Sequence, residues 1–137
     1  MDFFERIEDR TEKMDTLLCI GLDPAFSSLE IERHGSASCA ALVLEQNLRI
    51  IEATASYALA FKPNIAFYEA LGIAGISSLY KTLAQIPKDI PIIIDAKRGD
   101  ISNTAEAYAQ AIFGELKADA VTLNPYLGLD TLEPFLR

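Results

Sequence analysis

The 137-residue sequence has little of several features that mark whole classes of protein. Its two cysteines, Cys19 and Cys39, are too few for a disulfide framework, which fits a reducing compartment. Acidic residues outnumber lysine and arginine, and the formal net charge of −8 argues against nucleic acid or an anionic membrane as the main partner. No apolar run approaches the ~20 residues that a membrane-spanning helix needs.

Other missing patterns exclude further classes. The charged, amphipathic N-terminus has no signal-peptide pattern, so we expect a cytoplasmic protein. No G-x-G-x-x-G or Walker sequence follows an apolar run, which argues against a dinucleotide-binding or P-loop fold. The only histidine, His34, lies beside Gly35 in a polar stretch, where we expect it to be exposed and without a catalytic role.

What the sequence does contain is a regular alternation of apolar strands and helices. Half of its residues are hydrophobic and 23% are charged, as in a globular domain with a real core. Each predicted strand stops at polar or turn residues. The predicted strands are 17–22, 58–61, 92–94 and 119–124, and the predicted helices are 2–14, 40–57, 72–85 and 105 to about 116. Four such β/α units predict an α/β fold with a parallel sheet and right-handed crossovers.

Two segments are less regular. Residues 25–38 form a polar connection of no clear secondary structure, and residues 129–137 read as the start of another helix. In α/β folds the chemistry sits just past the carboxyl ends of the strands. The polar residues at those ends are therefore the candidates for a site.

The stretch 91–108 carries the strongest functional signal. Its apolar strand ends in Asp95, Lys97 and Asp100. Side chains alternate along a strand, so Asp95 and Lys97 are expected on one face, and Asp100 could return a second carboxylate after the Gly99 turn. Nearby carboxylates favour the charged form of a lysine, which makes Lys97 a positioned proton donor. The alternative is a solvated charge cluster that caps the strand.

Asp95-Ala96-Lys97-Arg98-Gly99-Asp100-Ile101, followed by Thr104, resembles the D-x-K-x-x-D-I-x-x-T signature of orotidine 5′-phosphate decarboxylase, in its long bacterial type. The segments FKPNIAFYEALG (61–72) and ADAVTLNPYLG (118–128) are similar to that family as well. The resemblance implies a (β/α)8 TIM barrel. A complete barrel needs about 200 to 250 residues, so we expect residues 1–137 to hold the first four β/α units, the N-terminal half of a single domain.

The resemblance also implies a reaction, the decarboxylation of orotidine 5′-monophosphate to uridine 5′-monophosphate without metal or organic cofactor. Lys97 would protonate the carbon that loses CO2, Asp95 would hold Lys97 beside the departing carboxylate, and Lys62 would complete the charge network. Asp100 and Thr104 would act across the interface of a homodimer.

The substrate-binding residues implied in this chain are Asp23, which would contact the ribose, and Thr104. Asn124 could also line the site, although a strand terminator is an equal reading of its position. In the family the phosphate-binding arginine lies in the second half of the barrel. We therefore expect this chain alone to bind substrate poorly and to turn over little.

Other readings remain open at this point. A sister enzyme of the superfamily, a magnesium-dependent sugar-phosphate decarboxylase or synthase, shares the D-x-K-x-x-D pattern but has an acidic metal ligand where this chain has Lys62. A non-catalytic half-barrel that acts only as a folding or assembly module is distinguished by whether the chain restores activity when it is mixed with a C-terminal half. A flavodoxin-like binding domain would need a fifth strand, which the pattern does not supply.

Overall fold

The structure is a computed structural model, and it describes residues 2–136. The helices are α1 (Phe3–Met14), α2 (Ser28–His34), α3 (Ser36–Thr54), α4 (Ile65–Glu69), α5 (Gly72–Leu83) and α6 (Ser102–Ala109), which continues as the π-helical turn η1 (Gln110–Glu115). The strands are β1 (Cys19–Gly21), β2 (Ala60–Lys62), β3 (Ile93–Arg98) and β4 (Ala120–Leu123). The alternation predicted from the sequence is confirmed.

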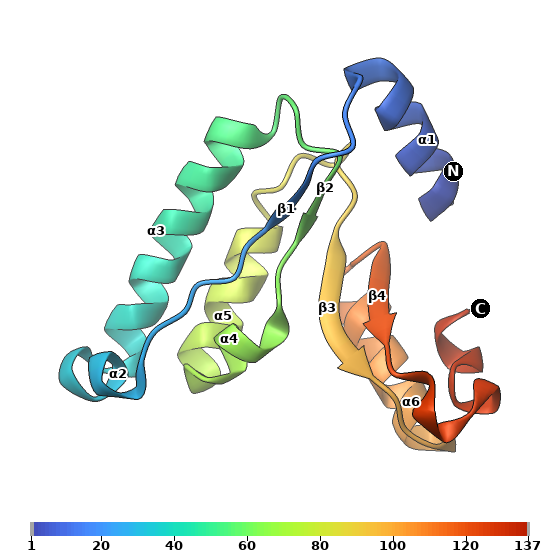
Figure 1. The fold of residues 1–137 in the computed structure, drawn as a ribbon. Helices are drawn as coiled ribbons and strands as arrows, with labels where there is room; N and C mark the ends of the chain where they lie inside the picture. The colour runs from blue at the N-terminus through green and yellow to red at the C-terminus, as the bar shows by residue number, and fades with distance from the viewer. Residues whose placement is uncertain (1, 137) are drawn as a thin grey trace.

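All four strands run in one direction, as two parallel pairs (Figure 1). In the first pair, Cys19 of β1 is opposite Ala60 of β2, and in the second, Ile93 of β3 is opposite Ala120 of β4. Only isolated bridges join β2 to β3, and in Figure 1 the two pairs spread apart toward their carboxyl ends. Helices α3 to α5 lie beside the first pair and α6 beside the second.

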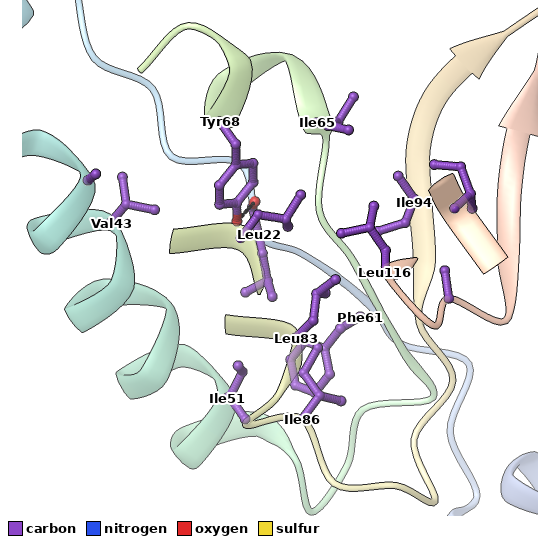
Figure 2. Packing of buried hydrophobic residues seen from close by; sticks show 14 of the residues in the cluster. Leu22, Val43, Ile51, Phe61, Ile65, Tyr68, Leu83, Ile86, Ile94 and Leu116 are labelled. Atoms are coloured by element: carbon purple, nitrogen blue, oxygen red, sulfur yellow. Dashed lines mark hydrogen bonds between the residues drawn. The ribbon is translucent and has the colours of Figure 1, made fainter. Parts of the chain in front are cut away.

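The main core lies between the strands and helices α3 to α5. Phe61, Tyr68, Leu79 and Ile94 are completely buried there, and Figure 2 shows several of these side chains converging. A smaller cluster of Ala105, Ala109 and Phe135 packs under α6. The core therefore anchors each strand from the helical side and leaves the polar residues at the carboxyl ends free for a site.

Helix α1 closes the amino ends of the strands. Its buried Arg10 donates from Nε to the carbonyl oxygen of Ala58 at 2.7 Å, from Nη2 to that of Ala55 at 2.8 Å, and from Nη1 to Asp89 at 2.6 Å. The Ala58 carbonyl group would otherwise be buried without this donor, and the guanidinium supplies three donors in one plane.

One segment that the sequence left open has a defined structure, and one local prediction was wrong. The connection 25–38 contains α2, which a capping box starts: Oγ of Ser27 accepts from the Glu30 N–H at 3.3 Å, and the Glu30 carboxylate accepts from the Ser27 N–H at 2.8 Å. That S-x-x-E signal was present in the sequence. The expected helix from residue 129 is instead two 3₁₀ turns, η3 (Leu129–Thr131) and η4 (Glu133–Phe135), since Pro134 lacks the N–H that a longer helix needs. Arg137 lies outside the described residues.

Candidate active site

The charge cluster forms at a bulge in β3. Ile94 is opposite Val121 and Arg98 is opposite Leu123, so four steps along β3 match two along β4. Within this bulge Lys97 has a φ of 48°, in the left-handed region. The predicted contact is confirmed, since Lys97 Nζ lies 2.5 Å from Asp95 Oδ1. Simple strand alternation does not produce it, because the bulge breaks the two-residue period.

Asp95 lies between two ammonium groups. Its Oδ1 faces Lys97, and its Oδ2 lies 3.5 Å from Nζ of Lys62, which projects from the carboxyl end of β2. The Asp95 side chain is 12% exposed, against 32% for Lys62 and 66% for Lys97. The hydrogen bond from Lys97 lowers the pKa of the Asp95 carboxyl, and a hydrogen bond from Thr122 and the charge of Lys62 lower it further. The carboxyl group is therefore ionised, and it holds the exposed ammonium of Lys97 in place.

Thr122 completes this cluster from β4. Its Oγ1 donates to Asp95 Oδ1 at 2.7 Å and accepts from the backbone N–H groups of Ala96 and Lys97, each at 3.1 Å. Sequence reasoning missed Thr122. The available signal was a polar residue in the middle of an otherwise apolar strand, Ala120–Leu123.

Asp23 is exposed at the carboxyl end of β1, next to β2. Its Oδ1 accepts from the backbone N–H of Asn64 at 2.9 Å, two residues after Lys62. The backbone N–H of Leu22 donates to the carbonyl oxygen of Lys62 at 3.2 Å, which fixes the relative height of the two strand ends. The structure thus brings Asp23 to the same edge as Lys62.

The remaining candidates lie farther along the chain. Asp100 Oδ1 accepts from its neighbour's N–H, that of Ile101, at 2.8 Å, and within residues 2–136 it forms no ion pair with Lys97. The expected return of this carboxylate to Lys97 is therefore not seen within the chain. Thr104 lies partly exposed in the first turn of α6. Asn124 is exposed, and its Oδ1 accepts from the Tyr126 N–H at 3.0 Å, the contact of a strand terminator.

Arg98 is a second residue that sequence reasoning did not select. Its Nη2 donates to Glu69 of α4 at 2.9 Å, and its guanidinium lies 4.8 Å from the ring centre of Tyr108 on α6. Arg98 thus connects the end of the bulge to α4 and α6. These contacts restrain the backbone next to Lys97.

Comparison with known proteins identifies the family. The model of the orotidine 5′-phosphate decarboxylase / HUMPS family matches residues 16–137. This chain belongs to that family. It is 49% identical over 134 residues to the orotidine 5′-phosphate decarboxylase of Herpetosiphon aurantiacus, covering 98% of this chain and 49% of the relative. It is 44% identical over 140 residues to that of Leptospira interrogans, covering 99% of this chain and 50% of the relative.

Solved structures of the decarboxylase agree. The Leishmania donovani OMP decarboxylase is 42% identical with a TM-score of 0.86, over 100% of this chain and 50% of that one. The putative orotidine-monophosphate decarboxylase of Toxoplasma gondii is 43% identical with a TM-score of 0.88, over 98% and 44%. The expected α/β fold of the TIM-barrel family, with four of its β/α units, is confirmed. The chain spans about half the length of the curated relatives that it matches.

Two kinds of feature are absent from the described part of the chain, a metal-ligand cluster and a membrane-spanning helix. Among residues 2–136, no group of three or more His, Cys, Asp or Glu side chains is arranged to hold a metal ion. None of the helices in the described part of the chain is long and apolar enough to cross a membrane.

Proposed function

We propose that this chain carries the catalytic charge network of an orotidine 5′-monophosphate decarboxylase that makes uridine 5′-monophosphate in pyrimidine biosynthesis. The observation that carries the proposal is the arrangement Lys62–Asp95–Lys97, with one ionised carboxylate between two ammonium groups at the carboxyl ends of β2 and β3. Both the family and the names of the relatives support this reaction.

The chemistry follows from the charges. When the bond from the pyrimidine ring to the carboxylate breaks, CO2 leaves and the electron pair stays on the ring carbon. The Lys97 ammonium stabilises that negative charge and then transfers its proton to the same carbon. Asp95 orients Lys97. The charge of Lys62 offsets the negative charge on Oδ2 of Asp95, and Lys62 also reaches toward the ribose of the substrate, which Asp23 binds. Asn124 lines the same edge of the site.

We further propose that the working enzyme is a homodimer with a composite site. Asp100 is partly exposed and makes no ion pair with the Lys97 of its own chain within the described residues, which leaves its carboxylate available to a partner's site. Thr104 follows it on α6 and would act with it. No organic cofactor or metal enters this mechanism. The location in the cytoplasm stays a prediction from the sequence.

The magnesium-dependent members of the superfamily are the second candidate. They place an acidic ligand at the end of the second strand, where this chain has Lys62 only 3.5 Å from Asp95. An ammonium group there repels a divalent cation, which favours the decarboxylase. A third possibility is a half-barrel module without activity. An inactive mixture with a C-terminal half would distinguish it from the two enzymes.

The test follows the ultraviolet absorbance of orotidine 5′-monophosphate. The purified chain is assayed alone and together with the C-terminal half of the Herpetosiphon aurantiacus relative, with and without a chelator. We expect little turnover by the chain alone, more in the mixture, and no effect of chelation. Loss of activity on chelation would favour the magnesium-dependent reaction, and an inactive mixture would favour the assembly module.

Lys97→Ala should abolish the activity of the mixture. The matched control is Lys117→Ala, since Lys117 is also exposed and also has a left-handed backbone, with a φ of 56°, but lies outside the charge network. The same substitution there should leave turnover unchanged. Equal losses in the two variants would contradict the role of Lys97.

A further inference from the structure

Thr122 is the only polar residue of β4, and its hydroxyl uses its full hydrogen-bonding capacity. A hydroxyl has one proton to donate and two lone pairs that accept. The Thr122 hydroxyl donates to Asp95 at 2.7 Å and accepts from Ala96 and Lys97 at 3.1 Å each. All three partners belong to the bulge that carries the charge network.

The backbone N–H groups of the bulge in β3 require an acceptor, and the hydroxyl oxygen of Thr122 provides it. Because β3 has extra residues between Ile94 and Arg98, the consecutive N–H groups of Ala96 and Lys97 both reach the same side of the strand and donate to Thr122. One side-chain oxygen therefore accepts from both backbone donors of the bulge. It thereby supports the left-handed backbone of Lys97, a conformation that a lysine adopts only where its surroundings hold it.

The two N–H groups also fix the direction of the hydroxyl proton. With both lone pairs occupied, the proton can point only toward the remaining acceptor, Asp95 Oδ1. The carboxylate then has one orientation, in which Oδ1 receives Lys97 and Oδ2 faces Lys62. A single hydroxyl therefore couples the backbone that carries Lys97 to the carboxylate that holds its ammonium.

We propose that Thr122 is a positioning residue of the decarboxylation site, which sets the orientation of Asp95 and the backbone conformation of Lys97 together. This inference rests on the proposed function for its catalytic consequence, but its structural part does not depend on turnover. The groups that face Asp95 are Lys62 from β2, Lys97 from the bulge and Thr122 from β4. After the hydrogen bond from Lys97, the hydrogen bond from Thr122 lowers the pKa of Asp95 further.

Thr122→Val tests the proposal, because valine keeps the shape and removes the hydroxyl. Thr122→Ser keeps the hydroxyl. In the active mixture described above, we expect the valine variant to lose about 10- to 100-fold in kcat, the range expected for one hydrogen bond to a charged group, with KM changed less than about threefold. The serine variant should recover most of the loss.

A second readout needs no activity. Carboxyl-carbon NMR of the chain, assigned with Asp95→Asn, should show the pKa of Asp95 rising toward its ordinary value in Thr122→Val and staying low in Thr122→Ser. The amide signal of Lys97 should move in the valine variant. If that variant does not fold, Thr122→Cys serves instead, since a thiol is a weak donor.

The matched control is Thr131→Val. Thr131 is a buried threonine whose hydroxyl also donates a 2.7 Å hydrogen bond, to the carbonyl oxygen of Gly128, but it lies outside the bulge. It should lose stability without moving the Asp95 titration. An unchanged Asp95 pKa and Lys97 amide in Thr122→Val would overturn the proposal. Altered NMR signals in Thr122→Val, together with an inactive mixture of the wild-type chain and the C-terminal half, would support the positioning role and reject the proposed function.

Discussion

The hydroxyl of Tyr68 donates a 2.8 Å hydrogen bond to the carbonyl oxygen of Leu22, one residue before Asp23 (Figure 2). Nδ2 of Asn47 donates to the same hydroxyl at 2.9 Å and to Oγ1 of Thr82 at 3.1 Å. These side chains are buried and come from α3, α4 and α5. A polar network inside the core therefore fixes the strand end on which Asp23 stands.

Tyr68→Phe should destabilise the protein by about 1–3 kcal/mol, because it leaves the Leu22 carbonyl without its buried donor and removes one of the two acceptors of the Asn47 amide. Chemical denaturation measures the change in the free energy of unfolding. Tyr80→Phe removes a hydroxyl from a side chain that is 44% exposed on α5, and should change stability little. Equal effects at the two positions would contradict a special role for the Tyr68 hydroxyl.

Arg10→Met should cost about 2–4 kcal/mol of stability. The substitution keeps most of the apolar stem but removes the buried donors of the Ala55 and Ala58 carbonyls. The matched change Arg49→Met breaks an exposed ion pair with Glu45 on the surface of α3 and should cost about 0.5 kcal/mol or less. Thermal unfolding of the two variants compares them directly. A midpoint for Arg10→Met no lower than that of Arg49→Met would contradict a stabilising role for the hydrogen bonds of Arg10.

Gly99→Ala should destabilise the protein by about 1–3 kcal/mol, because a Cβ at residue 99 would lie 2.5 Å from the carbonyl oxygen of Asn124. Relief requires β3 and β4 to separate where the Asn124 N–H donates to the Arg98 carbonyl at 2.7 Å. Gly21→Ala is the control, since its Cβ would meet Asp23 Oδ2 at an ordinary 3.4 Å. Hydrogen exchange of the Asn124 amide should accelerate in the first variant only.

The contribution of Asp95 to stability should depend on pH in one direction. The native pKa of this carboxyl is below its unfolded value of about 3.9, because Lys97 and Thr122 bind the ionised form. As pH falls, the unfolded state takes up the proton first, so the contribution is complete above about pH 5 and is lost as pH falls through the unfolded and then the native pKa.

Asp95→Asn cannot titrate, so its unfolding free energy provides the reference for this effect. The difference between wild type and Asp95→Asn should be constant from about pH 7 to pH 5 and should shrink below about pH 4. Denaturation series at each pH measure it. A difference that stays constant down to pH 3, or grows there, is incompatible with a lowered native pKa.

Much of the fold followed from local pattern. Alternating apolar runs and turn residues predicted the four strands and most helices, and DAKRGDI marked the carboxyl end of β3 as the position of the charged residues. Even the missed helix α2 had its capping signal in the chain, at Ser27 and Glu30. These features depend on residues within a few positions of one another, so the sequence by itself determined them.

The geometry of the site depended on pairing across the sheet. Lys97 reaches Asp95 because β3 bulges against β4, and Thr122 meets the Lys97 backbone from 25 residues away. A two-residue period predicts an unbroken strand and carries no information about a register shift, which the packing of both strands sets. The sequence determined which charged groups are available to the proposed site, and only the tertiary structure decided how they are held, because strand register is a non-local property.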